Sequence, residues 1–208
     1  MITFPRIIVL LLSPTRLVID RLKDNRTNAQ SKADLLLRWN HRFFLYDLFV
    51  AFVGVVFSLL PPPHVLPQAL GWVVFIVAYS RCNEIVFALL HDVGRELDLA
   101  ESSTTLTTGQ RIKMAMRSYV GLFINFGVIY YFVPKLFPAA FFAPPLDNFV
   151  DALYFSGVTI ATVGYGDIKP AHVVTKLLVL YELFSGLLLL VVALSVYLSA
   201  HGCQRKKQ

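Results

Sequence analysis

The sequence predicts an all-α integral membrane protein with four transmembrane helices and one shorter, re-entrant helix. Of its 208 residues, 56% are hydrophobic and only 15% are charged, whereas a soluble domain carries about a quarter charged residues. The hydrophobic residues are gathered in blocks, four of which reach or approach the ~20 residues that an apolar helix needs to cross a bilayer. A fifth block is too short to cross, and a glycine-rich stretch follows it directly.

The first two blocks are expected to form peripheral transmembrane helices. They run over residues 43–60 and 69–90, and three prolines follow the first. Both carry charged side chains at membrane depth, where charge is costly: Asp47 in the first, Arg81 and Glu84 in the second. We therefore expect Arg81 to pair with Asp47 or Glu84, in a mainly structural role. Voltage sensing is the weaker alternative, because a sensor helix needs several arginines and this segment has one.

The third and fourth blocks, residues 116–137 and 172–200, flank the short block at residues 149–160. The distribution of Lys and Arg predicts the orientation. Eight of the 19 lie in the first 42 residues, and others lie in the connection between the second and third blocks and in the C-terminal tail. The positive-inside rule places both termini and this connection in the cytoplasm. The short block then enters and leaves from the outside, as a re-entrant helix. The formal net charge of +6 is explained by this topology, so no nucleic-acid partner is expected.

The stretch Thr-Ile-Ala-Thr-Val-Gly-Tyr-Gly-Asp at residues 159–167 follows the short block. Gly164 and Gly166 can adopt backbone angles closed to other residues, which lets successive carbonyls turn toward one axis. Irregular backbone at membrane depth is tolerated only where protein or a water-filled cavity satisfies it. Four such strands around an axis would stack rings of carbonyl oxygens, which can replace the hydration shell of a potassium ion.

By this motif, residues 149–200 resemble the pore module of potassium channels, with residues 116–137 as the outer helix. The residues that carry the resemblance are Thr159, Thr162 and the run Val163 to Asp167, in the pattern T-x-x-T-V-G-Y-G-D. The resemblance implies the tetrameric potassium-channel pore fold. It also implies that dehydrated K⁺ is bound by the Thr162 hydroxyl and by the backbone carbonyls of four filter residues: Thr162, Val163, Gly164 and Tyr165. Gly166 completes the selectivity filter.

The expected organisation has five parts. They are a cytoplasmic N-terminal segment, two peripheral transmembrane helices, a cytoplasmic linker, a pore domain and a basic cytoplasmic tail, at residues 1–42, 43–91, 92–115, 116–200 and 201–208. The N-terminal segment is expected to include an interfacial helix, with an ordinary ordered segment as the alternative. The pore domain comprises the outer helix, the pore helix, the filter and the inner helix, the last three at residues 149–160, 162–166 and 172–200.

The surroundings of the filter depart in part from the family pattern. Val158 stands where many small prokaryotic channels carry a glutamate, and Tyr154 and Phe155 stand where many relatives have two tryptophans. Tyr154 can offer its hydroxyl to Asp167 at the outer mouth, where a ring of four carboxylates would raise the local cation concentration. Tyr154 and Thr159 are therefore expected to support the filter, with altered inactivation as a possible consequence.

The pore helix adds one further expectation and the inner helix adds two. Asp147 or Asn148 is expected to cap the pore helix, whose C-terminal end then favours a cation at the pore centre. Gly186 falls where relatives place a hinge glycine, and close helix packing is an equally weighted reading. Glu182, one turn earlier, is a further filter support: it is expected to brace the back of the pore helix rather than line the pore.

These expectations describe a potassium-selective channel subunit that conducts K⁺ passively. One filter per chain implies three further copies in a homotetramer, in the plasma membrane or bacterial inner membrane, with lipid as the other partner. No nucleophile, metal cluster or phosphate loop suggests an enzyme or a cofactor, and Cys82 and Cys203 are read as free thiols. The alternatives are a regulatory subunit, a nonselective cation channel and a transporter built from degenerate filters. His91 and His201 are minor candidates for pH-dependent gating.

Overall fold

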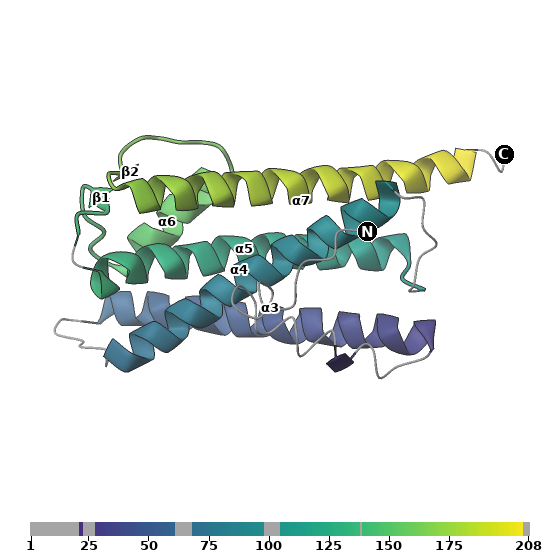
Figure 1. The fold of residues 1–208 in the computed structure, drawn as a ribbon, viewed down its shortest axis with the longest axis horizontal. Coiled ribbons are helices and arrows are strands. Elements are labelled where there is room, and N and C mark those ends of the chain that lie inside the picture. The colour runs from purple at the N-terminus through teal and green to yellow at the C-terminus, as the bar shows by residue number, and fades with distance from the viewer. Residues whose placement is uncertain (1–20, 23–27, 61–67, 98–104, 138, 206–208) are drawn as a thin grey trace.

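The computed structural model describes residues 21–22, 28–60, 68–97, 105–137 and 139–205, with the backbone alone for 91–97 and 196–205. Five helices account for most of this part of the chain (Figure 1): α3 Ala29–Leu59, α4 Gln68–Leu97, α5 Thr108–Leu136, α6 Phe149–Ile160 and α7 Val173–Arg205. Two short strands, β1 Phe142–Ala143 and β2 Lys169–Pro170, pair antiparallel. The expected interfacial helix and the end of the basic tail fall largely outside the described residues.

Four of these helices are long and apolar enough to cross a membrane: Ala29–Leu59, Gln68–Leu90, Thr108–Leu136 and Val173–Ser195. The predicted all-α membrane class with four spans is thereby confirmed. α6 has 12 residues, which makes it about 18 Å long and too short to cross. Its re-entrant placement stays a prediction.

α3 begins well before the apolar block that predicted it. Its N-cap is Asn28, whose side chain accepts a 3.0 Å hydrogen bond from the backbone N–H of Gln30. Because the turns after Asn28 hold polar residues that suit a helix as well as a loop, hydropathy alone placed the start near Phe43. The cap supplies the physical start signal instead.

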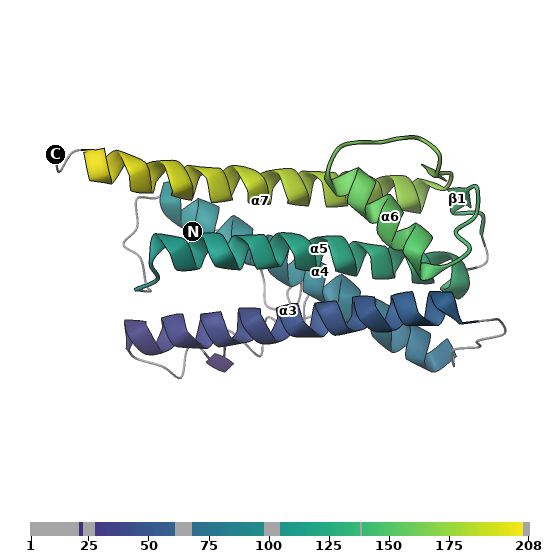
Figure 2. The same ribbon diagram turned by 180° about the vertical axis from the view of Figure 1, so that it is seen from behind.

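α5 is the central helix of the bundle. It contacts α3, α4, α6 and α7, and Figures 1 and 2 show it running between α7 and α3. Its second half is buried nearly all round, with Leu122, Phe126, Ile129 and Tyr130 fully enclosed. A helix that is apolar on every side is expected to be covered on every side. The hydrophobic core of the chain therefore lies around α5.

α6 sits against glycines on three of its neighbours. A side-chain carbon added to any of these glycines would lie very close to a side chain of α6. The distance would be 2.5 Å for Gly54 of α3, 3.0 Å for Gly127 of α5 and 2.7 Å for Gly186 of α7. Glycine lets helices approach closely in membranes, where van der Waals packing holds helices together. The short helix is thus fixed from three directions at one end of the bundle (Figure 2).

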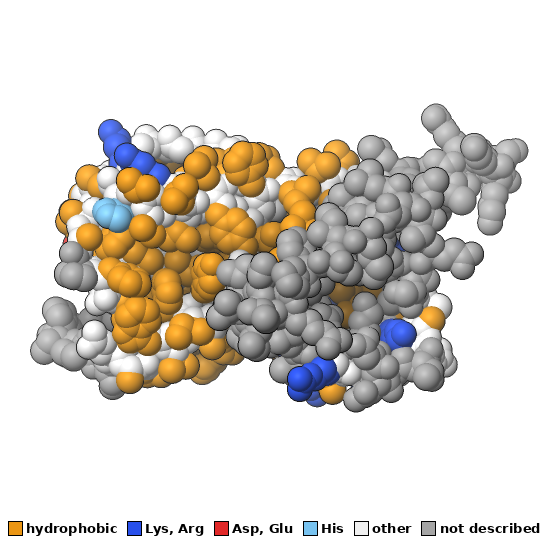
Figure 3. Space-filling model, in the orientation of Figure 1, with side chains coloured by type: hydrophobic (Ala, Val, Ile, Leu, Met, Phe, Trp, Pro, Cys, Tyr) orange, Lys and Arg blue, Asp and Glu red, His pale blue; other side chains and the backbone are white. Residues whose placement is uncertain are grey.

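The outer surface carries the apolar character expected of a membrane protein. On the face shown in Figure 3, hydrophobic side chains gather in a broad patch over the left half, and the few visible Lys and Arg side chains lie at or beyond the edges of this patch. Exposed large hydrophobic residues occur on all four long helices. Such a surface suits lipid or further protein rather than water.

Candidate functional site

The N-terminus of α6 is capped from its own chain segment and from another helix. Asn148 is the N-cap, and its side chain accepts a 3.0 Å hydrogen bond from the backbone N–H of Asp151. This decides between the two candidates, Asp147 and Asn148. The backbone N–H of Phe149 donates to Ser58 Oγ on α3 at 3.1 Å. Two of the first amides of α6, which have no acceptor inside the helix, are thereby satisfied.

The C-terminal turn of α6 leads directly into the glycine-rich loop. The backbone N–H of Thr162 donates to the Thr159 carbonyl at 2.9 Å. The Val158 carbonyl accepts from two further loop residues, Val163 at 2.9 Å and Gly164 at 3.2 Å. The first residues of the loop therefore bond to carbonyls of the last turn of α6, and the position of the loop follows that of the helix.

The backbone of the loop alternates in handedness. Thr162, Gly164 and Gly166 have φ angles of 57°, 57° and 78°, while Val163 and Tyr165 between them are not in the left-handed region. Alternation of left- and right-handed residues permits successive carbonyls to turn to the same side of the chain. The two glycines were predicted on this ground. The left-handed Thr162 was not, because a β-branched residue rarely adopts positive φ.

The loop is open to its surroundings in the single chain. Residues 161–167 are all exposed, with Val163 at 51% and Tyr165 at 72% of full exposure. In Figures 1 and 2 the loop arches away from the helices beside α7. A backbone of this shape needs other groups to satisfy it at membrane depth.

Tyr154 joins α6 to the far end of the loop. Its hydroxyl donates a 2.8 Å hydrogen bond to Asp167, as expected, and its ring stacks on that of Tyr165 at 6.4 Å between centroids. The second carboxyl oxygen of Asp167 accepts from the backbone N–H of Ile168 at 3.0 Å. The Tyr154 hydrogen bond is the main cause that lowers the pKa of Asp167 below its ordinary value. Asp167 therefore stays negative to a lower pH than a free carboxyl.

Glu182 lies fully buried between α5, α6 and α7. One carboxyl oxygen lies 2.7 Å from the hydroxyl of Tyr130 on α5, and the other lies 2.5 Å from the hydroxyl of Ser156 on α6. Ser156 is also 2.8 Å from the carbonyl of Phe123. Glu182 thus contacts the back of α6, the place that the bracing prediction gave it. Its role as a support of the filter stays a prediction.

Gly186 lies in the continuous part of α7, opposite the last residue of α6. A side-chain carbon there would be 2.7 Å from Cγ1 and 3.3 Å from Cδ1 of Ile160. The close-packing interpretation of this glycine therefore has a direct contact behind it. The hinge interpretation stays a prediction.

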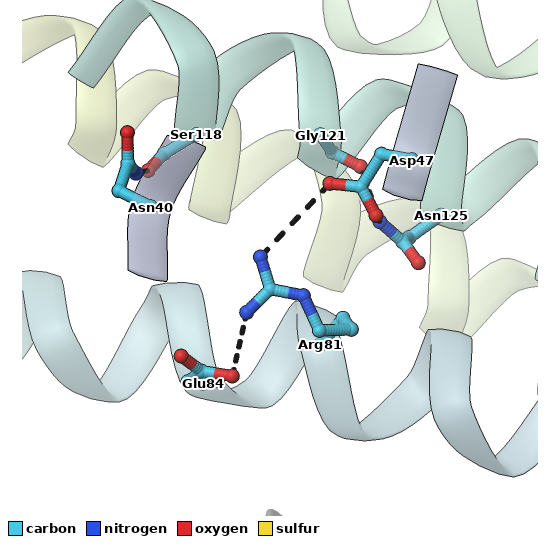
Figure 4. Close-up of polar contacts among 7 residues, drawn as sticks. All are labelled: Asn40, Asp47, Arg81, Glu84, Ser118, Gly121 and Asn125. Atoms are coloured by element: carbon cyan, nitrogen blue, oxygen red, sulfur yellow. Dashed lines mark hydrogen bonds and ion pairs between the residues drawn. The ribbon is translucent and has the colours of Figure 1, made fainter. Parts of the chain in front are cut away.

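A second polar cluster joins α3, α4 and α5 (Figure 4). Arg81 makes an ion pair with Glu84 at 2.6 Å and a longer one with Asp47 at 3.9 Å. Asn125 donates to Asp47 at 2.9 Å and to the Gly121 carbonyl at 2.7 Å. Asp47 and Arg81 are almost fully buried. The predicted pairing of Arg81 is confirmed, with both carboxylates as partners.

Residues on neighbouring helices complete these contacts, and sequence reasoning did not single them out as site residues: Ser58, Tyr119, Asn125, Tyr130 and Ser156. Tyr119, for example, donates from α5 to the Ile160 carbonyl at the end of α6, at 3.3 Å. The available signal was a lone polar side chain inside an apolar block, which at membrane depth needs a partner. That signal marks the residue without naming the partner. The two histidine candidates, His91 and His201, have side chains outside the described part of the chain.

Comparison with known proteins agrees with this geometry. Residues 118–200, from α5 through α7, match a family described as ion channel. Two-pore potassium channel 4 of Arabidopsis thaliana is 41% identical over 69 residues, which are 33% of this chain and 23% of that protein. The hyperpolarization-activated voltage-gated potassium channel of Methanocaldococcus jannaschii is 44% identical over 48 residues, 22% of this chain and 23% of that protein.

Two-pore potassium channel 2 of Arabidopsis thaliana is 57% identical over 37 residues, 18% of this chain and 8% of that protein. The chain thus aligns with about a quarter or less of the length of these curated relatives. No solved structure matches the chain. The family match at residues 118–200 covers most of α5, the short helix, the loop and most of α7.

Proposed function

We propose that this chain is a member of the potassium channel family and a subunit of a potassium-selective channel, because residues 118–200 match an ion-channel family and similar curated proteins are potassium channels. The observation that carries the proposal is the alternating backbone of Thr162, Gly164 and Gly166, directly after a short apolar helix. This is the conformation that a carbonyl-lined filter requires. The matched family is one of ion channels, and no enzymatic step is proposed.

In the proposed pore, each subunit contributes oxygens to a line of ion sites. The carbonyls of Thr162, Val163, Gly164 and Tyr165 and the Thr162 hydroxyl replace the water around K⁺, with Gly166 completing the filter. The C-terminal end of α6 carries partial negative charge, which favours a cation nearby. The Asp167 carboxylates attract cations to the outer mouth. Movement of K⁺ is passive, down its electrochemical gradient, and no cofactor takes part.

Four copies of the chain are proposed to surround one axis. The exposure of residues 161–167 supports this, because a filter strand open on one side needs neighbours. α7 supports it as well, with exposed apolar residues spaced alternately three and four apart: Leu177, Leu180, Phe184, Leu187, Val191 and Leu194. Such spacing forms a straight seam along a helix for packing against another helix. A closed ring of identical subunits then gives a homotetramer.

The proposed setting is a cell membrane, with both termini on the cytoplasmic side. α3, α4, α5 and α7 cross the bilayer, and α6 enters from the outer side and returns through the filter. The distribution of Lys and Arg supports this orientation. Lipid is then the partner of the outward apolar faces.

The test is a K⁺ efflux assay with the full chain in liposomes, together with the mass of the assembly in detergent. The wild type is expected to release K⁺ down its gradient and to have the mass of four chains. Gly164→Asp places a bulky charged residue at a φ of 57° and is expected to stop efflux. Gly109→Asp is the matched control. Position 109 lies in the first turn of α5, and a side-chain carbon added there would have no atom within 4 Å.

Two results would contradict the proposal. Efflux that persists unchanged in Gly164→Asp would mean that ions do not pass through this loop. A tetramer that releases no K⁺ under any applied voltage or pH would favour a regulatory subunit instead.

A further inference from the structure

We propose that α3 positions the filter, acting through Ser58 and Gly54 on the first residue of α6. This inference rests on the proposed function, in that the loop after α6 is taken to be the conducting filter. It assigns a positioning role to the N-terminal half of the chain, a role that the sequence alone did not predict. Ser58 is a positioning residue, since it touches the pore helix and not the ion.

Ser58 is held in one orientation by two hydrogen bonds. Its hydroxyl hydrogen is donated to the Gly54 carbonyl at 3.0 Å, and its oxygen accepts from the Phe149 backbone N–H at 3.1 Å. That N–H is the first of α6 and has no acceptor within its own helix. Replacement of Ser58 by an apolar residue would leave a partly buried donor without this partner, which is the costly way to lose a hydrogen bond.

The side chain of Phe149 is fixed at the same point. Its ring lies so close to α3 that a carbon added to Gly54 would be 2.5 Å away. On the other side it packs edge-on against Tyr131 of α5, with centroids 5.6 Å apart. Phe149 is 4% exposed. The first residue of α6 is therefore held at two points. Its backbone N–H bonds to α3, and its ring packs between α3 and α5.

A displacement at the start of α6 reaches the filter through a short rigid helix. α6 is held near its middle by the contact of Ser156 with Glu182, and about 18 Å separates its two ends. The Val158 carbonyl near its far end accepts from Val163 and Gly164 of the filter. Any tilt about the middle of the helix therefore moves the acceptor on which the filter strand rests.

α3 is itself tied to the rest of the bundle. Asp47 is held by Asn125 of α5 and by Arg81 of α4, as Figure 4 shows. Ser58 lies 11 residues further along α3, which corresponds to about 16 Å of helix. A shift of α3 against α4 and α5 would therefore change the Ser58 contact, and through it the filter. This gives α3 and α4 a route by which to modulate conduction.

The experiment compares four full-length proteins in planar bilayers: wild type, Ser58→Ala, Ser58→Thr and Phe52→Leu. Phe52 lies on the same helix, is 66% exposed and serves as the matched control. Ser58→Ala is expected to shift the balance between conducting and non-conducting filter by about five-fold, the scale of one net hydrogen bond. It should also raise Na⁺ permeability relative to K⁺. Ser58→Thr keeps the hydroxyl and should restore both, while Phe52→Leu should match wild type.

A second readout is independent of conduction. Amide hydrogen exchange of the full chain in nanodiscs is expected to speed up in Ser58→Ala at Phe149 and also at Val163 and Gly164, with Thr again restoring protection. Faster exchange at Phe149 alone, or a permeability ratio in Ser58→Ala equal to that of wild type, would overturn the inference. A wild type without K⁺ current would instead refute the proposed function. In that event the exchange pattern still decides whether α3 positions the loop.

Discussion

The buried carboxyl of Glu182 on α7 lies 2.5 Å from the hydroxyl of Ser156 on α6. Ser156 has one hydroxyl hydrogen and faces two acceptors, since the Phe123 carbonyl lies 2.8 Å away. Both contacts can be hydrogen bonds if the Ser156 hydroxyl donates to the Phe123 carbonyl and the Glu182 carboxyl donates to the Ser156 oxygen. A protonated carboxyl can do so while its second oxygen accepts from Tyr130. Glu182 would then brace α6 as a neutral group, which also suits its full burial.

We predict that Glu182→Gln keeps this arrangement and that Glu182→Ala does not. The glutamine amide can donate to Ser156 and accept from Tyr130, as the protonated carboxyl would. Alanine leaves a cavity and unpaired hydroxyls, and should cost about 2–5 kcal/mol of unfolding free energy. Thermal unfolding in detergent measures both. If Gln proved as damaging as Ala, Glu182 would have to act as a charged group.

Tyr154→Phe is expected to make conduction more sensitive to acid outside the membrane. In the wild type the Tyr154 hydrogen bond lowers the pKa of Asp167. The carboxylate and its contacts are therefore fully present above the ordinary pKa of a carboxyl and are lost as the pH falls through the lowered value. Without the hydroxyl that loss should begin at a higher pH. Conductance at low K⁺, measured against external pH, reports the shift.

Asp167→Asn is the control for this titration, because it should remove the acid-dependent step altogether. An identical pH profile in Tyr154→Phe and wild type would show that the hydrogen bond has no influence on the outer mouth.

Gly186→Ala is predicted to destabilise the chain, because the new carbon would lie 2.7 Å from Ile160. Overpacking of this kind typically costs about 1–3 kcal/mol. Gly109→Ala is the matched control, with no atom within 4 Å of the added carbon, and should be neutral or stabilising. Thermal unfolding of the two variants gives the comparison. Unchanged stability in Gly186→Ala together with altered opening would favour the hinge interpretation.

Arg81→Met is expected to be strongly destabilising, since it leaves Asp47 without its cation in a buried site. Loss of one partner of a buried ion pair costs about 3–5 kcal/mol. The double variant Arg81→Met with Asp47→Asn removes both charges and should recover part of this loss. A double-mutant cycle on unfolding free energy tests the coupling. Strictly additive effects would mean that the two side chains do not interact.

Much of the fold could be predicted because membranes impose few solutions on an apolar chain. Block length gave the four spans, and the T-V-G-Y-G motif located the loop. The start of α3 was missed, since hydropathy carries no trace of the Asn28 cap. The choice of Asn148 over Asp147 likewise depended on geometry.

Contacts between uncharged residues of distant segments could not be predicted from the sequence. Ser58 and Phe149 lie 91 residues apart, and neither residue type indicates the other. Arg81 was predicted to need a carboxylate, because buried charge demands one, but Asn125 as a further partner of Asp47 was not foreseen. The backbone conformation of Thr162 was not predicted either, because its positive φ runs against the ordinary preference of threonine.

The reversal potential under a K⁺ gradient opposed by Na⁺ tests the central claim most directly. The wild-type chain in a planar bilayer is predicted to reverse near the K⁺ equilibrium potential, with Gly109→Asp behaving alike and Gly164→Asp carrying no current. A robust current that reverses near zero would show that this loop does not select K⁺, and would contradict the account.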